Sequence, residues 1–214
     1  MKRSATLAAA SSRSRSRGFS MVELVVSLVI VLILSAVAIP TLMNSLREYQ
    51  LNDAATRVSD LLKFTRFEAV RKNTQVSFWL QANGASNWIV GVDSNGNGVI
   101  DPAERQEVIT GFATLLPSGG LPPATPITTA LGVGALTALS GNPGSVTFDA
   151  RGAIRTGVVP GSPLATNVSI IYIGSTTDGV TPDPQYGFRG VVVLPAGGTQ
   201  VWTAPPGGTW QRIS

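Results

Sequence analysis

The sequence predicts an α+β protein in which a long N-terminal helix, first transmembrane and then amphipathic, packs on a C-terminal antiparallel β-sheet or sandwich domain. Three observations support this fold class. Residues 24–46 carry no charge and are mostly apolar. Apolar or small residues then recur at helical spacing as far as Ala69. From Gln75 onward, short β-type runs alternate with turn residues, as in an antiparallel sheet.

The basic character of the chain belongs mainly to its N-terminus. The 214 residues have a formal net charge of +4, but five of the basic residues precede Gly18. The rest of the chain carries 11 basic and 12 acidic residues. The high pI of the whole sequence therefore comes mainly from its N-terminus and does not indicate nucleic-acid binding. The sequence contains no Cys and no His, which excludes thiol nucleophiles, His-based triads and the usual zinc sites.

The uncharged segment is long enough to cross a membrane. As a helix, residues 24–46 would rise about 35 Å, compared with a hydrocarbon core of about 30 Å. Arg13, Arg15 and Arg17 precede this segment and predict a cytoplasmic N-terminal side. The sequence therefore predicts a single-pass protein whose remaining chain lies on the outer side of the membrane.

Glu23 stands at the start of the apolar segment, where a carboxylate requires a partner. A charge costs roughly 2.5 kcal/mol or more at the centre of a membrane helix, and less near its end. Cleavage between Gly18 and Phe19 would place a new α-amino group one helical turn from Glu23, with the carboxylate favoured by the helix dipole. The alternative is a secretory signal cut after Ala38, in the small-residue sequence 36–38, which would release a soluble product.

The stretch Gly18-Phe19-Ser20-Met21-Val22-Glu23, followed by an apolar helix, resembles the class III leader of type IV pilins and type II secretion pseudopilins. The resemblance implies that residues 1–18 are a prepilin leader and that a prepilin peptidase cuts after Gly18 and N-methylates Phe19. It also implies that Glu23 pairs with the N-terminus of a neighbouring pilin or pseudopilin. The expected location is the bacterial inner membrane, with the C-terminal domain in the periplasm.

Pro40 lies where that family has a helix-perturbing proline. Independently of the resemblance, proline removes the hydrogen bond to the Ala36 carbonyl and crowds the preceding turn. This predicts a kink or local melting near residues 36–40. The alternative is that Pro40 only marks the end of the membrane helix.

Residues 44–73 are expected to continue the helix beyond the 19–43 transmembrane and assembly segment. The segment 64–73 followed by Val76 resembles the end of the long helix and the first strand of the GspH/FimT-type branch of minor pseudopilins and minor pilins. The stripe predicted to face the sheet comprises Leu51, Ala54, Ala55, Val58, Leu61, Leu62, Thr65 and Ala69.

Residues 74–214 are expected to form the periplasmic β-rich domain. Turns are predicted at residues 150–152 and at Gly197-Gly198. Residues 108–148 carry no charge and are rich in Gly, Pro, Thr and Ala, which predicts a long loop near 113–144. An alternative is a patch laid against a neighbouring subunit. The eight predicted strands span 75–80, 88–92, 106–109, 145–149, 153–156, 168–173, 189–194 and 200–203.

The stretch DSNGNGVIDPAE, residues 93–104, has oxygen ligands at the spacing of a calcium-binding loop. The candidate ligands are Asp93, Asn95, Asn97, Asp101 and Glu104. The flanking segments are predicted strands rather than helices, and a turn held by Asn and Asp side chains gives the same pattern. The sequence leaves both alternatives open, and no other cofactor is indicated.

The leading functional hypothesis is a non-enzymatic minor pseudopilin in the periplasmic filament of a type II secretion system. A second hypothesis is a FimT-like minor pilin acting in type IV pilus assembly or DNA uptake. The basic residues of the chain after the leader are scattered, which predicts weak, salt-sensitive DNA binding and argues against nucleic acid as a partner. A third is a soluble secreted hydrolase or binding protein cut after Ala38. The candidate DNA-binding residues are Arg151, Arg155, Arg189 and Arg212.

Overall fold

The computed structural model describes residues 18–84, 87–116, 119–139 and 144–213. The described chain divides between Leu42 and Met43 into two units. Helix α1 (Met21–Lys72) supplies the described helix of the first unit and continues into the second. Within the second unit, the predicted stripe is confirmed, because every one of its eight residues is at most 4% exposed. Burying this stripe is what fixes one face of α1 against the sheets.

The first sheet is antiparallel and has the strand order β3-β2-β1-β6-β7. Val76, Phe78 and Leu80 alternate along β1 on the face that joins the core, while Ser77 and Trp79 point to the other face. The period-2 pattern of the sequence therefore set which side of this sheet is covered by α1. Its strands are β1 (Val76–Ala82), β2 (Trp88–Asp93), β3 (Gln106–Ile109), β6 (Gly144–Phe148) and β7 (Ile154–Arg155).

The second sheet has the order β12-β11-β10-β8-β4, with β5 and β9 also paired to β8. β5 runs parallel to β8, and the neighbouring strand pairs are antiparallel. Its strands are β4 (Thr114–Leu116), β5 (Leu136–Ala138), β8 (Val168–Thr176), β9 (Pro182–Asp183), β10 (Phe188–Val193), β11 (Thr199–Ala204) and β12 (Gln211–Arg212). The 3₁₀ helix η1 (Pro184–Tyr186) leads into β10.

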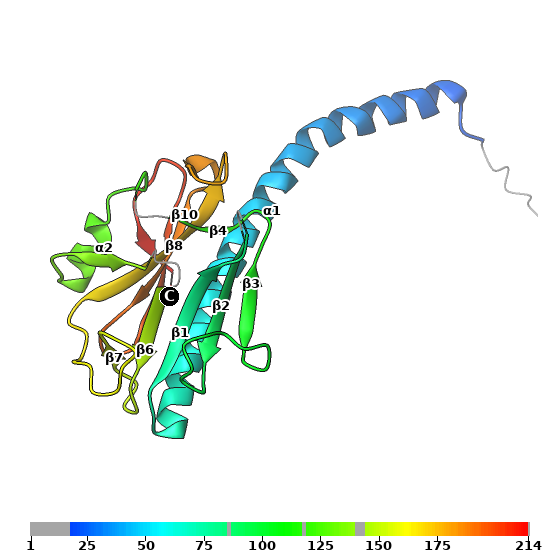
Figure 1. The fold of residues 1–214 in the computed structure, drawn as a ribbon. Coiled ribbons are helices and arrows are strands. Elements are labelled where there is room, and N and C mark those ends of the chain that lie inside the picture. Colours follow the sequence, from blue (N-terminus) through cyan, green and yellow to red (C-terminus); the bar gives the residue numbers. More distant parts are fainter. Residues whose placement is uncertain (1–17, 85–86, 117–118, 140–143, 214) are drawn as a thin grey trace, which may run out of the picture. The chain divides into compact units, whose positions relative to one another are not determined.

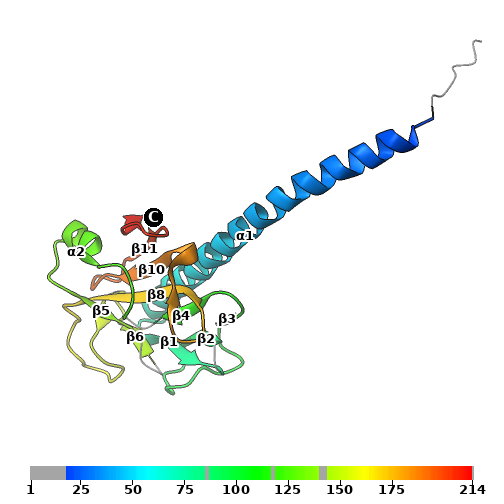
Figure 2. The same ribbon diagram turned by 90° about the horizontal axis from the view of Figure 1, so that it is seen from above.

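The second sheet is covered on both faces. One face shares the main core with α1 and the first sheet, through residues such as Ile171 and Val191. The other face forms a second core with Ile127 of helix α2 (Thr125–Leu131) and Trp210 near the C-terminus. Figures 1 and 2 show α2 and the domain part of α1 on opposite sides of β8 and β10. Burial on both faces explains why β8 and β10 lack a polar alternation.

The prediction of a long loop near 113–144 is wrong. The described parts of this segment contain β4, α2 and β5, and Ile127 is fully buried. The sequence TPITTAL has weak intrinsic helix propensity, so α2 depends on packing against the second sheet. Trp210 adds to this cover by donating its indole N–H to the Pro122 carbonyl at 3.2 Å. Within residues 119–139 Ile127 alone is buried, and the residues partly buried against the second core are Leu121, Leu131, Val133, Leu136 and Ala138.

The two predicted hairpin turns are confirmed, and they meet at the end of α1. Gly152 and Gly197 each donate a backbone hydrogen bond that closes the turn, to Asp149 and Leu194. The Arg66 guanidinium donates through Nε to the Gly152 carbonyl at 3.1 Å. Because a hairpin of each sheet is held at this junction, it fixes the two sheets relative to α1.

Candidate functional site

The residues of the predicted processing site lie at the start of α1 and are exposed. Gly18 precedes the helix, Phe19 is 76% exposed, and Glu23 lies in the first turn. Arg13, Arg15 and Arg17 lie outside the described residues. Of the described helices, α1 alone is long and apolar enough to cross a membrane, judged by length and composition. Its most apolar 18-residue window has a mean hydropathy of 2.9 and is not buried at all within the described chain.

Pro40 lies inside α1, and the residues on both sides of it remain helical. The predicted local melting near residues 36–40 is therefore wrong for this structure. One proline removes a single hydrogen bond, and the neighbouring turns keep theirs. Thr41 also donates its hydroxyl to the Val37 carbonyl at 3.2 Å, within the same turn. The kink remains a prediction.

The acidic loop between β2 and β3 is held by hydrogen bonds to its own backbone. Asp93 is 3% exposed, and its Oδ1 accepts from the Gly96 N–H at 2.7 Å and from the Asn97 N–H at 3.2 Å. Its Oδ2 accepts from the Gly98 N–H at 2.8 Å. Three N–H donors on one carboxylate explain how a buried acid is tolerated between a strand and a turn.

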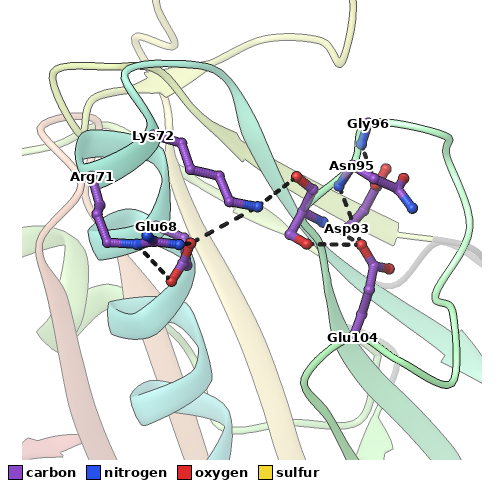
Figure 3. Close-up of polar contacts among 8 residues, drawn as sticks. Glu68, Arg71, Lys72, Asp93, Asn95, Gly96 and Glu104 are labelled. Carbon is purple, nitrogen blue, oxygen red and sulfur yellow. Dashed lines mark hydrogen bonds and ion pairs between the residues drawn. The ribbon is translucent and has the colours of Figure 1, made fainter.

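Glu104 closes the other end of the loop. Its Oε1 accepts from the Ser94 N–H at 2.6 Å and from the Asn95 N–H at 3.2 Å, and its Oε2 accepts from the Asp101 N–H at 3.1 Å. Lys72, at the end of α1, donates to the Ser94 carbonyl at 2.9 Å and so ties the helix to the loop (Figure 3). This last contact has no local sequence signal, because it joins residues 22 positions apart.

These contacts match the second interpretation of residues 93–104, a turn held by Asn and Asp side chains. Among the described residues, no group of three or more Asp, Glu, His or Cys side chains is arranged to hold a metal ion. The side-chain amides of Asn95 and Asn97 donate to the same Asp101 oxygen, at 2.9 and 2.8 Å. The loop is therefore closed by its own amides and backbone N–H groups.

We expect calcium to leave the melting temperature of the protein unchanged, because hydrogen bonds within the loop already satisfy its carboxylates. Differential scanning fluorimetry with millimolar calcium and with a chelator measures this. Glu104→Gln should lower the melting temperature equally in both conditions, because it weakens charge-assisted hydrogen bonds. A calcium-dependent rise in the wild type that disappears in Glu104→Gln would contradict the expectation.

Two family profiles match the chain on either side of residue 54. The first, described as type II transport protein GspH, matches residues 54–197, more than half of the chain. The second, the prokaryotic N-terminal methylation motif, matches residues 13–39. The chain belongs to the GspH family. Its GspH region begins in the buried stripe of α1 and ends at the Gly197 turn, and the methylation motif contains Gly18, Phe19 and Glu23.

Pilin-like proteins are among the relatives of this GspH-family chain. It is 33% identical to the pilin-like protein PilA1 of Thermus thermophilus over 89 residues, which are 42% of this chain and 56% of that protein. It thus spans little more than half the length of this relative. Two crystal structures of the type IV minor pilin FimU of Pseudomonas aeruginosa are similar at TM-scores of 0.42 and 0.39. They are 17% and 16% identical and cover 78% and 77% of this chain, and 94% and 98% of their own.

The GspH family is one of structural subunits rather than of enzymes, as the sequence predicted. A GspH domain preceded by an N-methylation motif makes this chain a minor pilin or pseudopilin. Its N-terminal apolar helix indicates membrane anchoring.

The four candidate DNA-binding arginines do not form one free cationic surface. Arg189 is 5% exposed and donates through Nε to Asn52 of α1 at 2.6 Å, so its assignment as a DNA contact is wrong. The side chain faces the core because residues of β10 alternate between two covered faces. Burial lowers the pKa of Arg189, and nearby Glu48 opposes this effect.

Arg155 is also held within the domain. Its guanidinium donates to the Ser162 carbonyl at 2.6 Å and to Asp149 Oδ2 at 3.1 Å. Arg151 and Arg212 are exposed. The two exposed arginines offer few phosphate contacts, which supports the expectation of weak, salt-sensitive DNA binding.

We expect Asp149→Asn to lower the free energy of unfolding by about 1–3 kcal/mol near neutral pH, because a buried carboxylate loses charge-assisted hydrogen bonds. Asp149 accepts from the Arg151 and Ala153 N–H groups, both at 2.9 Å, and from Arg155. Burial alone would raise the pKa of Asp149, but the hydrogen bonds from Ala153, Arg151 and Arg155 outweigh it and lower the pKa.

A lowered pKa makes this stabilisation complete above the unfolded value of about 3.9 and removes it as the pH falls through the folded value. The difference between wild type and variant should therefore shrink in acid. Urea unfolding at neutral and acidic pH measures this difference. Asp60→Asn is the control, because Asp60 is 56% exposed in its pair with Lys63 and should contribute little. A difference that stays constant down to strongly acidic pH would contradict the assignment.

Proposed function

We propose that this protein is a minor pseudopilin, a structural subunit of the periplasmic filament of a type II secretion system. The observation that carries the proposal is the uncovered apolar half of α1, which begins with a single carboxylate. Residues 24–46 have no charge, and the described part of the chain buries none of them. Such a surface needs lipid before assembly and other helices after it.

Processing between Gly18 and Phe19, followed by N-methylation of Phe19, completes the proposed assembly element. The match of the N-terminal methylation motif to residues 13–39 supports this step. A free α-amino group on Phe19 of one subunit would pair with Glu23 of its neighbour, which makes the carboxylate acceptable in an apolar environment. The prepilin peptidase and the inner membrane are therefore proposed partners, with the sheet domain on the periplasmic side.

A minor pilin of a type IV pilus is the second candidate. The similarity to the pilin-like protein PilA1 favours it over a soluble secreted protein. Both candidates use the same helix and the same processing site. They differ in the assembly that the subunit joins, which is a secretion filament in the first and a type IV pilus in the second. Deleting the gene in the source bacterium separates them: loss of protein export with pili intact supports the first, and loss of pili with export intact supports the second.

The mature N-terminus tests the proposal shared by both candidates. Mass spectrometry of the protein purified from its native membrane should find N-methylated Phe19 as the first residue. The same sample should lack peptides from residues 1–18. A mature protein beginning at Ile39 would instead establish a signal peptide cut after Ala38 and would overturn both filament assignments.

A further inference from the structure

The acidic loop contains sequences that are prone to deamidation and that have no role in the proposed function. Of the three Asn-Gly sequences in the chain, Asn95-Gly96 and Asn97-Gly98 lie in this loop and Asn83-Gly84 precedes it. In an Asn-Gly sequence, the glycine nitrogen loses its proton and attacks the side-chain amide carbon of asparagine. A nitrogen–carbon bond forms, the carbon–NH₂ bond breaks, and ammonia leaves with a proton. Water then opens the succinimide to aspartate or isoaspartate, with no change of oxidation state.

In the loop, Asp93 holds both glycine nitrogens that would attack. The Gly96 N–H donates to Asp93 Oδ1 at 2.7 Å, and the Gly98 N–H donates to Asp93 Oδ2 at 2.8 Å. Each proton must leave its hydrogen bond before the nitrogen can react. Losing that proton would also place a negative nitrogen against a carboxylate that is 3% exposed and little screened by water.

The side chains that would be attacked are held as well. Asn95 Oδ1 accepts from the Asn97 N–H at 2.9 Å, and Asn97 Oδ1 accepts from the Val99 N–H at 3.0 Å. Both side-chain amides donate to Asp101 Oδ2. Converting either asparagine to aspartate would replace an N–H donor facing Asp101 with a second carboxylate, so the product would strain the loop by like-charge repulsion.

Asn83-Gly84 provides the contrast. Asn83 and Gly84 are exposed at the end of β1, and Gly84 has a φ of 88°. Within the described residues, the Asn83 backbone N–H donates to the Asn87 carbonyl at 2.7 Å. No carboxylate among the described residues accepts from the Gly84 N–H, unlike the two glycines of the loop.

We propose that Asp93 protects Asn95 and Asn97 from deamidation and that Asn83 is the deamidation site of the folded chain. Asp93 acts by positioning: its carboxylate holds the N–H groups of the two nucleophilic nitrogens in hydrogen bonds. The proposal is independent of the filament function and would hold for the same domain in any assembly.

The test compares deamidation rates at the three asparagines in the folded and the unfolded protein. Full-length protein in detergent and the same protein in concentrated urea are incubated at mildly alkaline pH. Peptide fragmentation mass spectrometry then assigns the conversion to each site. We expect Asn95 and Asn97 to react roughly tenfold or more slowly in the folded protein, because hydrogen bonds must first open. Asn83 should react at similar rates in both states.

Asp93→Asn and Glu104→Gln separate the role of Asp93 from general order in the loop. Asp93→Asn should raise the folded-state rates at Asn95 and Asn97 towards their unfolded values. Glu104→Gln leaves the Gly96 and Gly98 acceptor in place and should keep both rates low. If Asp93→Asn does not fold, the comparison of the three sites in the folded wild type still decides whether Asn83 is the deamidation site and the loop asparagines are protected. Equal rates at Asn95, Asn97 and Asn83 in the folded wild type, or equal acceleration by both variants, would overturn the proposal.

Discussion

Glu23→Ala is expected to lower incorporation of the mature subunit into its filament by about a hundredfold to a few thousandfold. Glu23 lies in the first turn of α1, and residues 24–46 after it carry no charge. In the proposed assembly its carboxylate pairs with the N-terminus of a neighbour. Removing one partner of a buried pair costs about 3–5 kcal/mol, because the other charge is left uncompensated, and each 1.4 kcal/mol is a factor of ten.

The measurement is the fraction of processed subunit found in sheared or cross-linked filaments, with the membrane pool as reference. Ser27→Ala is a suitable control. Ser27 lies one turn further along the same helix, and its hydroxyl donates to the Glu23 carbonyl at 2.7 Å, so this change leaves the charge in place. Incorporation of the Glu23→Ala subunit at the control level would show that the carboxylate does not drive assembly.

Gly197→Ala is expected to have the largest effect on folding, with a loss of at least about 3–5 kcal/mol. Gly197 has a φ of 82°, where an L-residue is strained by roughly 1–2 kcal/mol. The larger part of the effect comes from contact. An added methyl group would overlap the Gly152 carbonyl oxygen and lie 2.9 Å from Arg66 Nε, so the two hairpins would have to separate.

Gly207→Ala is the matched control for this substitution. Gly207 has a φ of 66°, but nothing lies within 4 Å of an added methyl group. It should therefore lose only the conformational part, about 1–2 kcal/mol. Urea unfolding of both variants followed by tryptophan fluorescence measures the difference. Equal losses would mean that the junction of Gly152, Gly197 and Arg66 can open without disturbing the sheets.

The sequence predicted the long helix, its buried stripe and eight strand regions, because each has a local pattern. The stripe from Leu51 to Ala69 repeats with the helical period, and strands such as β3 are bounded by turn residues. It did not predict α2, β4, β5, β9 or β12. These elements are short and lack a regular alternation, and contacts with residues distant in the chain hold them in place, as Trp210 and Pro122 do.

The site residues divide in the same way. The motif from Gly18 to Glu23 could be recognised because its residues are adjacent and require no folded partner. Arg189 could not be placed from the sequence. Whether it meets solvent or Asn52 depends on which face of β10 is turned toward α1. The sequence also could not distinguish a cation-binding loop from a turn at residues 93–104, because both use the same hydrogen-bond donors and acceptors.

The sequence by itself determined the membrane-length apolar helix, the position of its one acid and the alternation between helix and sheet regions. These depend on composition and on spacing along the chain, which do not change on folding. Only the tertiary structure decided that α2 covers the second sheet and that Asp93 is surrounded by backbone N–H groups. The first outcome depends on contacts between segments distant in the chain, whose free energy is gained only when the domain folds. The second depends on which of two local structures residues 93–98 adopt, because the same donors and acceptors fit a turn and a cation-binding loop.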